Sequence, residues 1–245
     1  MSLISAPRKK YATGMKSLRE LYKIGKGPSS SHTMGPERAA LWFKAKYPEA
    51  TSFKAYLFGS LAKTGRGHRT DFIIKETLQP RPTEVVFDME NNDIPHPNTM
   101  RLAAYKGGEK LGEAEIYSVG GGAIRIKGED SVVPKDIYKL HTFTDIKNYC
   151  EEKNIRLWQY VEEVEGEDIW NYLSDIWLCM KDAINRGLND EGIIFGGLNV
   201  QKKAKSLYNK RHIDESPETR ENRLVCAYAY AVAEQNASCG TIVTA

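Results

Sequence analysis

A run of hydroxyl groups and one imidazole, residues 29–33, carries the richest chemistry in the chain. It consists of Ser29, Ser30, Ser31, His32 and Thr33. Pro36 follows it and opens a helical pattern that extends to about residue 47, as expected for a proline in the first turn of a helix. Free N–H groups and the helix dipole favour an anion such as a carboxylate or phosphate at such a helix start. A Ser-rich turn that only caps the helix would explain part of the pattern, but three serines, a histidine and a threonine in a row exceed what a cap needs.

A second candidate is His68, which follows two glycines in the segment 64–71. Gly65 and Gly67 let the backbone approach a ligand closely, and an imidazole titrates near neutral pH. Such a group can abstract the α-proton of an amino acid, which is the difficult step of a β-elimination. Asp71 would then orient the ring. A loop histidine that merely pairs with Asp71 would give the same pattern, and the spacing alone leaves both interpretations open.

The segment 27–36, GPSSSHTMGP, closely resembles a loop of the iron–sulfur L-serine dehydratases, which are L-serine ammonia-lyases. Three further segments are similar to that family: GSLAKTGRGHRTD at 59–71, DIPHPNTM at 93–100 and YSVGGG at 117–122. The likeness continues through residues 143–245. It therefore covers nearly the whole chain, although the family's helical domain extends further than this sequence does.

The resemblance implies roles for particular residues. His68 corresponds to the proposed general base, and His96, held between two prolines, to a histidine near the active site that would assist catalysis or orient the substrate. The resemblance also implies that the hydroxyl loop would contact L-serine through Ser29, Ser30, Ser31, His32 and Thr33. Supporting roles fall to Asp71, Gly65 and Gly67.

In the intact family enzyme a [4Fe-4S] cluster acts as a Lewis acid on the substrate. The resemblance places the cluster cysteines beyond Ala245, so we expect no metal ligands in this chain, no cluster bound to it alone, and no activity without the remainder of the α domain. No lysine stands in a sequence typical of a pyridoxal phosphate anchor. We further expect a cytoplasmic homodimer that degrades L-serine to pyruvate and ammonia and so feeds gluconeogenesis.

A different class of function stays open. Residues 15–140 also resemble the substrate-sensing regulatory domain of some phosphoglycerate dehydrogenases, and on that hypothesis the chain binds serine or a small anion without any chemistry of its own.

The amino-acid composition argues against nucleic-acid binding, a membrane span and a disulfide-bonded fold. The 245 residues carry a net charge of +3 with both signs interspersed, which gives no footprint for nucleic acid. No stretch approaches the ~18 consecutive apolar residues of a membrane span. Four scattered cysteines indicate cytoplasmic thiols rather than a disulfide framework.

Hydrophobic periodicity predicts an α+β fold, in which helices pack on a mainly antiparallel sheet and an incomplete all-helical domain follows. We expect an N-terminal arm at 1–14, an α+β domain at 15–142 and the helical domain at 143–245. In the first domain the pattern predicts a helix at 15–24, a loop at 76–82, and strands at 53–58, 84–87, 101–105, 113–118 and 123–127. In the second it predicts helices at 145–153, 156–165, 167–186, 200–210 and 220–236, and a last strand at 241–243.

Overall fold

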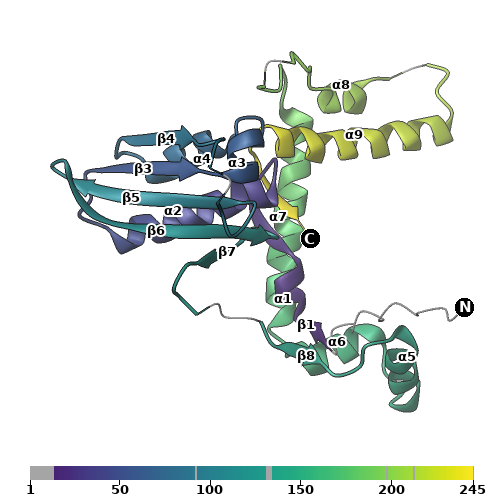
Figure 1. Ribbon diagram of the computed structural model, residues 1–245. Helices are drawn as coiled ribbons and strands as arrows, with labels where there is room; N and C mark the ends of the chain where they lie inside the picture. Colours follow the sequence, from purple (N-terminus) through teal and green to yellow (C-terminus); the bar gives the residue numbers. More distant parts are fainter. Residues whose placement is uncertain (1–13, 92, 131–133, 197, 212, 245) are drawn as a thin grey trace, which may run out of the picture. The chain divides into compact units, whose positions relative to one another are not determined.

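The computed structural model in Figure 1 describes residues 14–91, 93–130, 134–196, 198–211 and 213–244. The chain folds into two compact units, each built from two separate stretches of sequence. Unit 1 comprises residues 1–22 and 132–175, and unit 2 comprises residues 23–131 and 176–245. We describe each unit by itself. The predicted N-terminal arm, 1–14, lies outside the described residues except for Gly14.

Unit 2 is built on a five-stranded sheet with the order β4-β3-β5-β6-β7. Its strands are β3 (Ser52–Leu57), β4 (Thr83–Phe87), β5 (Thr99–Lys106), β6 (Glu109–Gly120) and β7 (Ala123–Ile126). β3 and β4 run parallel, and every other neighbouring pair is antiparallel. The hairpin between β5 and β6 turns at Gly107 and Gly108, which both adopt a positive φ that glycine tolerates best.

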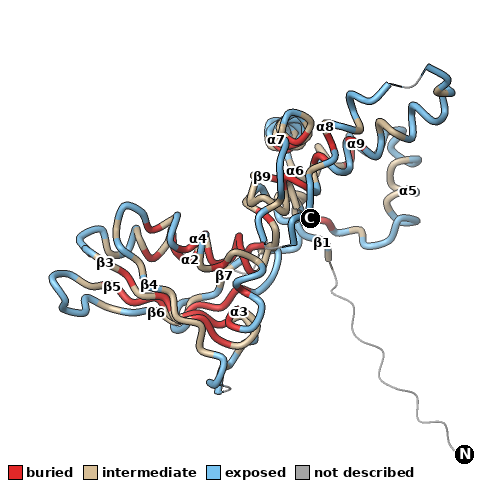
Figure 2. The backbone as a smooth tube through the Cα atoms, turned by 90° about the horizontal axis from the view of Figure 1, so that it is seen from above, coloured by how far each residue is buried: buried red, intermediate tan, exposed pale blue. Residues whose placement is uncertain are grey.

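Two helices, α2 (Gly35–Lys46) and α4 (Thr70–Leu78), pack on one face of this sheet (Figure 1). Buried and less buried residues alternate along β3, as expected for a strand with one covered face. The core between the layers contains Phe43, Leu57 and Ile73, all fully buried. Figure 2 shows the buried backbone concentrated in these strands and helices. A short helix, α3 (Gly59–Thr64), follows β3 directly.

The remainder of unit 2 includes most of α7 (Ile169–Asn189), with α8 (Ala204–Asn209) and α9 (Pro217–Ala237). The polypeptide backbones of α7 and α9 approach closely, because a Cβ at Gly187 would lie 2.3 Å from the carbonyl oxygen of Ala231. A two-stranded antiparallel sheet joins β2 (Lys23–Lys26) to β9 (Thr241–Thr244).

Unit 1 contains β1 (Met15–Lys16), α1 (Leu18–Leu21), β8 (Asp136–Tyr138), α5 (Phe143–Glu152), α6 (Leu157–Glu165) and the first turns of α7. The carboxylate of Glu165, at the end of α6, connects the start of α1 and the strand β8 through hydrogen bonds. It accepts hydrogen bonds from the Ser17 hydroxyl at 2.6 Å, the Leu18 amide at 2.7 Å and the Tyr138 hydroxyl at 2.8 Å. These polar contacts thus join segments of unit 1 that lie far apart in the sequence.

The structure confirms the α+β class and the mainly antiparallel sheet. The expected helix at 15–24 is wrong, because only residues 18–21 are helical and both flanks form short strands. The expected loop at 76–82 begins too early, since α4 continues to Leu78, and the expected helix at 200–210 is shorter, at 204–209. The domain boundary near residue 142 stays a prediction. None of the described helices is long and apolar enough to cross a membrane.

Candidate functional site

The hydroxyl loop forms one turn of π-helix, η1 (Ser30–Met34), that runs directly into α2. The Ser29 side chain caps it by accepting a hydrogen bond from the backbone amide of His32 at 3.1 Å. Wide helical turns of this kind are rare and frequently occur at functional sites. Gly35 is required just after the turn, because a Cβ there would lie 2.2 Å from the Ser118 hydroxyl at the end of β6.

His32 is buried, with 9% of its surface exposed, and both ring nitrogens meet hydroxyl groups. Nδ1 lies 2.9 Å from the Ser31 hydroxyl, and Nε2 lies 3.0 Å from the hydroxyl of Ser60 at the start of α3. Ser31 in turn lies 3.5 Å from Ser29, measured between hydroxyl oxygens. The result is a continuous hydrogen-bonded row of three hydroxyls and one imidazole.

His68 is half-buried and its ring faces that of His32, with 4.7 Å between the ring centroids. Its Nδ1 lies 3.0 Å from the carbonyl oxygen of Thr64. A carbonyl can only accept, so Nδ1 carries the proton in the neutral ring, and the lone pair is on Nε2. Nε2 is therefore the atom that could take a proton from a ligand.

Two threonines hold the two histidine segments together. The hydroxyl of Thr33 donates to the carbonyl oxygen of His68 at 2.9 Å, and the hydroxyl of Thr70 donates to the carbonyl oxygen of His32 at 2.6 Å. Both threonine side chains are fully buried. Since Thr33 is buried and its hydroxyl is engaged, we assign it to holding the loops, and direct contact with substrate stays a prediction for the other residues of the hydroxyl loop.

Burial, followed by the nearby imidazole of His68, lowers the pKa of His32, and a hydrogen bond with Ser60 opposes the shift only in part. His32 is thus neutral at physiological pH.

The glycines before His68 play different roles. A Cβ at Gly65 would lie 2.1 Å from the carbonyl oxygen of Leu61, so this position requires glycine for close backbone packing. A Cβ at Gly67 would meet nothing nearer than the Thr64 carbonyl oxygen at 3.5 Å. Asp71 lies in the first turn of α4 and, among the described residues, makes no hydrogen bond with His68. The Thr64 carbonyl orients the ring in its place.

His96 lies on the turn before β5, apart from this pair of rings. Its Nδ1 accepts a hydrogen bond from the Asn98 amide at 3.1 Å, and its ring lies 6.1 Å from that of Tyr117. The turn that carries His96 is connected to the site through the backbone, since the carbonyl oxygen of Pro97 accepts a hydrogen bond from the Ser60 amide at 2.8 Å. The structure therefore brings His68 together with the hydroxyl loop and leaves His96 as a neighbour.

Arg69 and Cys239 adjoin the site within unit 2. The guanidinium group of Arg69 lies 4.0 Å from the ring centroid of Phe72, and burial raises the pKa of the Cys239 thiol. Among the described residues, no group of three or more His, Cys, Asp or Glu side chains could hold a metal ion.

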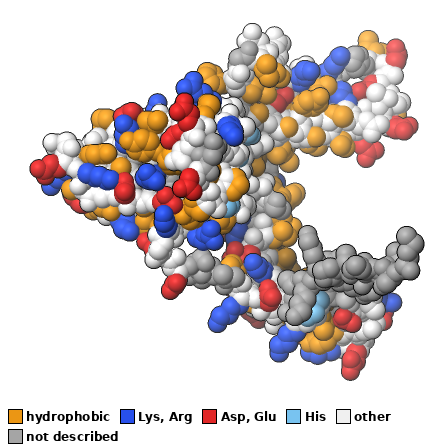
Figure 3. Space-filling view, in the orientation of Figure 1, with side chains coloured by type: hydrophobic (Ala, Val, Ile, Leu, Met, Phe, Trp, Pro, Cys, Tyr) orange, Lys and Arg blue, Asp and Glu red, His pale blue; other side chains and the backbone are white. Residues whose placement is uncertain are grey.

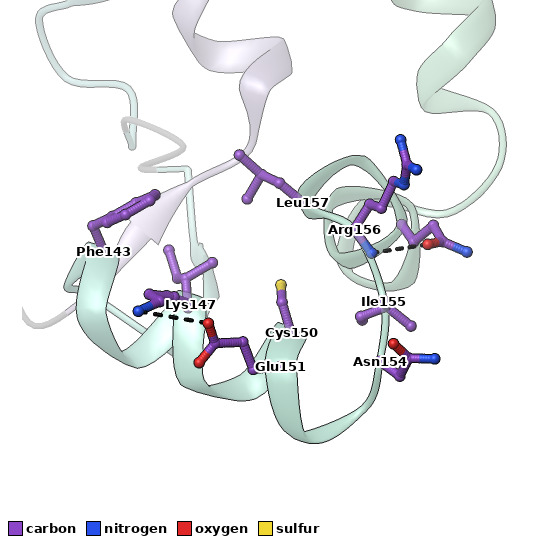
Figure 4. Close-up of a pocket in the computed structure, with 10 residues that line it drawn as sticks. Phe143, Lys147, Cys150, Glu151, Asn154, Ile155, Arg156 and Leu157 are labelled. Carbon is purple, nitrogen blue, oxygen red and sulfur yellow. Dashed lines mark hydrogen bonds and ion pairs between the residues drawn. The ribbon is translucent and has the colours of Figure 1, made fainter.

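A separate hollow of about 570 Å³ lies between α5 and α6 of unit 1. Figure 4 shows Phe143, Cys150 and Leu157 around it, with an ion pair between Lys147 and Glu151 on its wall. None of the expected site residues lines this hollow, so we locate the candidate site on unit 2.

Sequence reasoning overlooked Ser60, Thr64 and Thr70, which complete the site. All three lie within the segment 59–71 that we singled out for His68. Ser60 sits where a strand passes into a helix, a position where polar side chains often serve a site, and this was the available signal.

Two family models match this chain. The model described as serine dehydratase beta chain matches residues 17–82, and the one described as serine dehydratase alpha chain matches residues 59–245. The second match covers most of the sequence, and the chain belongs to the serine dehydratase family.

Curated proteins similar to this chain are also named serine dehydratases. The chain is 31% identical to "L-serine dehydratase TdcG" and 29% identical to "L-serine dehydratase 1", both of Escherichia coli, with 94% of this chain and 63% of each relative aligned. It is 30% identical to the "L-serine dehydratase" of Streptomyces coelicolor, with 94% of this chain and 62% of the relative aligned. The chain thus spans less than two thirds of the length of these relatives.

Proposed function

We propose that the chain takes part in the β-elimination of L-serine to pyruvate and ammonia, with His68 as the general base. One observation carries the proposal: the half-buried imidazole of His68, whose Nε2 has no hydrogen-bond partner among the described residues, lies against a row of hydroxyl groups in a chain of the serine dehydratase family.

In the proposed step Nε2 of His68 takes the proton from the α-carbon of L-serine. The electron pair of the broken C–H bond forms the double bond between the α- and β-carbons, and the β-hydroxyl leaves as hydroxide, which takes up the proton from Nε2 of His68 to give water. The aminoacrylate product takes up water and yields pyruvate and ammonia. Protonated His68 is stabilised by the Thr64 carbonyl, which still accepts from Nδ1–H at 3.0 Å.

The hydroxyl loop would bind and orient the substrate. The Ser29 and Ser31 hydroxyls and the amides at the start of the turn suit a carboxylate, since free N–H groups and the helix dipole favour an anion there. His32 would act as a positioning residue, because its two hydrogen bonds fix Ser31 and Ser60 around the face of His68.

The family implies a [4Fe-4S] cluster, and such clusters are held by four cysteine thiolates. The cysteines of this chain are Cys150, Cys179, Cys226 and Cys239, all free, and the described residues bring no three of them together. They do not fit a cluster site, so no step above is routed through one. We also propose a cytoplasmic location, a homodimer, and a role in amino-acid degradation that supplies gluconeogenesis.

The relatives named above are all L-serine dehydratases, which favours the lyase over the regulatory module that residues 15–140 also resemble. A binding experiment separates the two. L-serine is titrated into the chain while the His68 ring signals are followed by NMR, and pyruvate release is measured in the holoenzyme after anaerobic cluster assembly. We expect serine to perturb His68 and the holoenzyme to release pyruvate. Serine binding without any pyruvate from a cluster-loaded holoenzyme would instead support the regulatory module.

A further inference from the structure

A polar pocket of about 410 Å³ lies between α8 and α9 in unit 2. No residue of the candidate site lines it. Its walls carry four cationic and two tyrosine side chains: Lys210, Arg211, Arg220, Arg223, Tyr208 and Tyr228. The volume falls within the range of small-molecule sites in proteins. Figure 3 shows Lys and Arg side chains gathered over α8.

One of the four cations is already engaged and shapes the pocket. Arg223 binds the carboxylate of Glu215 through Nε and Nη2, at 2.7 and 2.8 Å, and donates through Nη1 to the carbonyl oxygen of Leu207 at 2.7 Å. Only 12% of the Arg223 side chain and 8% of the Glu215 side chain are exposed. This buried pair, which carries no net charge, ties α9 to the end of α8.

The other three cations have no counter-charge among the residues that the structure describes. In those parts of the chain the side chains of Lys210, Arg211 and Arg220 make no hydrogen bond and no ion pair, and all three residues are exposed. Glu215 is the single acidic residue on the described pocket wall, and Arg223 neutralises it. The acidic residues in the first turns of α9, Glu218 and Glu221, do not line the pocket. The wall therefore carries excess positive charge, which attracts an anion.

The aromatic side chains add a second recognition element. The rings of Tyr208 and Tyr228 lie 6.1 Å apart, tilted by 44°, and both are about 40% exposed. Exposed tyrosine rings offer a surface on which a base can stack. Arginine forks suit the oxygens of a phosphate group, and lysine adds a point charge.

We propose that this pocket binds a nucleoside di- or triphosphate, whose phosphates contact Lys210, Arg211 and Arg220 and whose base stacks on Tyr208 or Tyr228. The site is independent of the proposed lyase reaction, and its test uses no catalysis.

The test is isothermal titration calorimetry on the full chain with ADP, pyrophosphate and adenosine. We expect ADP to bind, and Arg220→Gln and Lys210→Gln each to weaken ADP binding by about tenfold, the loss expected for one charge-assisted hydrogen bond. Lys106→Gln, which removes the same charge from the distant β5–β6 hairpin, should leave ADP binding unchanged. Tyr228→Ala should weaken ADP binding but not pyrophosphate binding.

Several outcomes would overturn the proposal. They are the absence of ADP binding at millimolar concentration, equal weakening by Lys106→Gln, and ADP binding no tighter than pyrophosphate binding. Circular dichroism of each variant verifies that the helices are retained, and Lys210 and Arg220 are both exposed, so either variant alone can decide the question.

Discussion

The imidazole rings of His32 and His68 lie 4.7 Å apart, yet they have opposite surroundings. His32 is buried and bonded to a hydroxyl at each nitrogen, whereas His68 is half-buried and, among the residues that the structure describes, is hydrogen-bonded only through Nδ1. A pair of identical side chains is thereby divided into one ring that holds hydroxyl groups in place and one ring with a free lone pair.

Replacement of His68 by Asn should abolish most of the proposed activity. The amide cannot accept the α-proton, so kcat for pyruvate formation by the holoenzyme should fall by about 100-fold or more. The affinity for L-serine should change little, because the hydroxyl loop remains. Lys106→Gln is the control for charge and expression. Retention of wild-type kcat in His68→Asn would refute the role of base.

The lowered pKa of His32 predicts a particular dependence of stability on pH. Between the ordinary histidine pKa of about 6.5 and the lower value in the folded protein, the unfolded chain binds a proton that the folded chain does not. The stability contributed by neutral His32 is therefore present above that range and is lost as the pH falls through it. His32→Gln has no such proton to bind.

Urea denaturation of both proteins between about pH 8 and pH 5 measures this effect. The advantage of the wild type over His32→Gln in free energy of unfolding should shrink as the pH falls. An advantage that grows toward low pH would mean that His32 is charged in the folded protein.

Thr70→Val tests the cross-link between the two histidine segments. The substitution keeps the shape of the buried side chain but leaves the carbonyl oxygen of His32 without the hydroxyl that lies 2.6 Å away. We expect a loss of about 1–3 kcal/mol in the free energy of unfolding. Thr77→Val is the matched control, because the Thr77 hydroxyl only donates to a carbonyl of its own helix, that of Ile73. Equal losses in the two variants would argue against a special role for Thr70.

The two glycines before His68 should differ in their tolerance of a methyl group. Gly65→Ala brings a Cβ to within 2.1 Å of a backbone carbonyl, so it should destabilise the protein by about 1–3 kcal/mol. Gly67→Ala meets its nearest neighbour at 3.5 Å and should change stability by less than about 0.5 kcal/mol. Thermal and chemical denaturation of the two variants provide the comparison, and the reverse order would show that the backbone path at these glycines is wrong.

The sequence predicted those parts of the fold that depend on local pattern. The strands at 101–105 and 113–118 and the long helix at 167–186 followed from apolar residues at the spacing typical of strands and helices. The expected helix at 15–24 failed for a non-local reason. Residues 23–26 pair with residues 241–244, and such a distant partner overrides the helical periodicity of a short segment.

The residues of the candidate site could be predicted from the sequence, but the hydrogen bonds between them could not. Residue chemistry singled out the hydroxyl loop and His68, and the structure brings them together. The sequence could not show that His68 bonds to the backbone carbonyl of Thr64 rather than to Asp71, because every residue has a backbone carbonyl and the residue types therefore give no sign of this contact. The sequence also could not show that the Thr33 hydroxyl bonds to the backbone of the 64–71 segment and the Thr70 hydroxyl to the backbone of the hydroxyl loop. These two hydrogen bonds depend on how the two segments approach each other in space.

The pairing of β2 with β9 has a consequence for biosynthesis. β2 leads directly into the hydroxyl loop, and its partner strand is made of residues 241–244. A chain emerging from a ribosome therefore cannot anchor the entrance of that loop until more than two hundred further residues have been translated. Until then the nascent chain carries the hydroxyl loop without the strand pairing that precedes it, so the loop can reach its final conformation only after residues 241–244 have emerged.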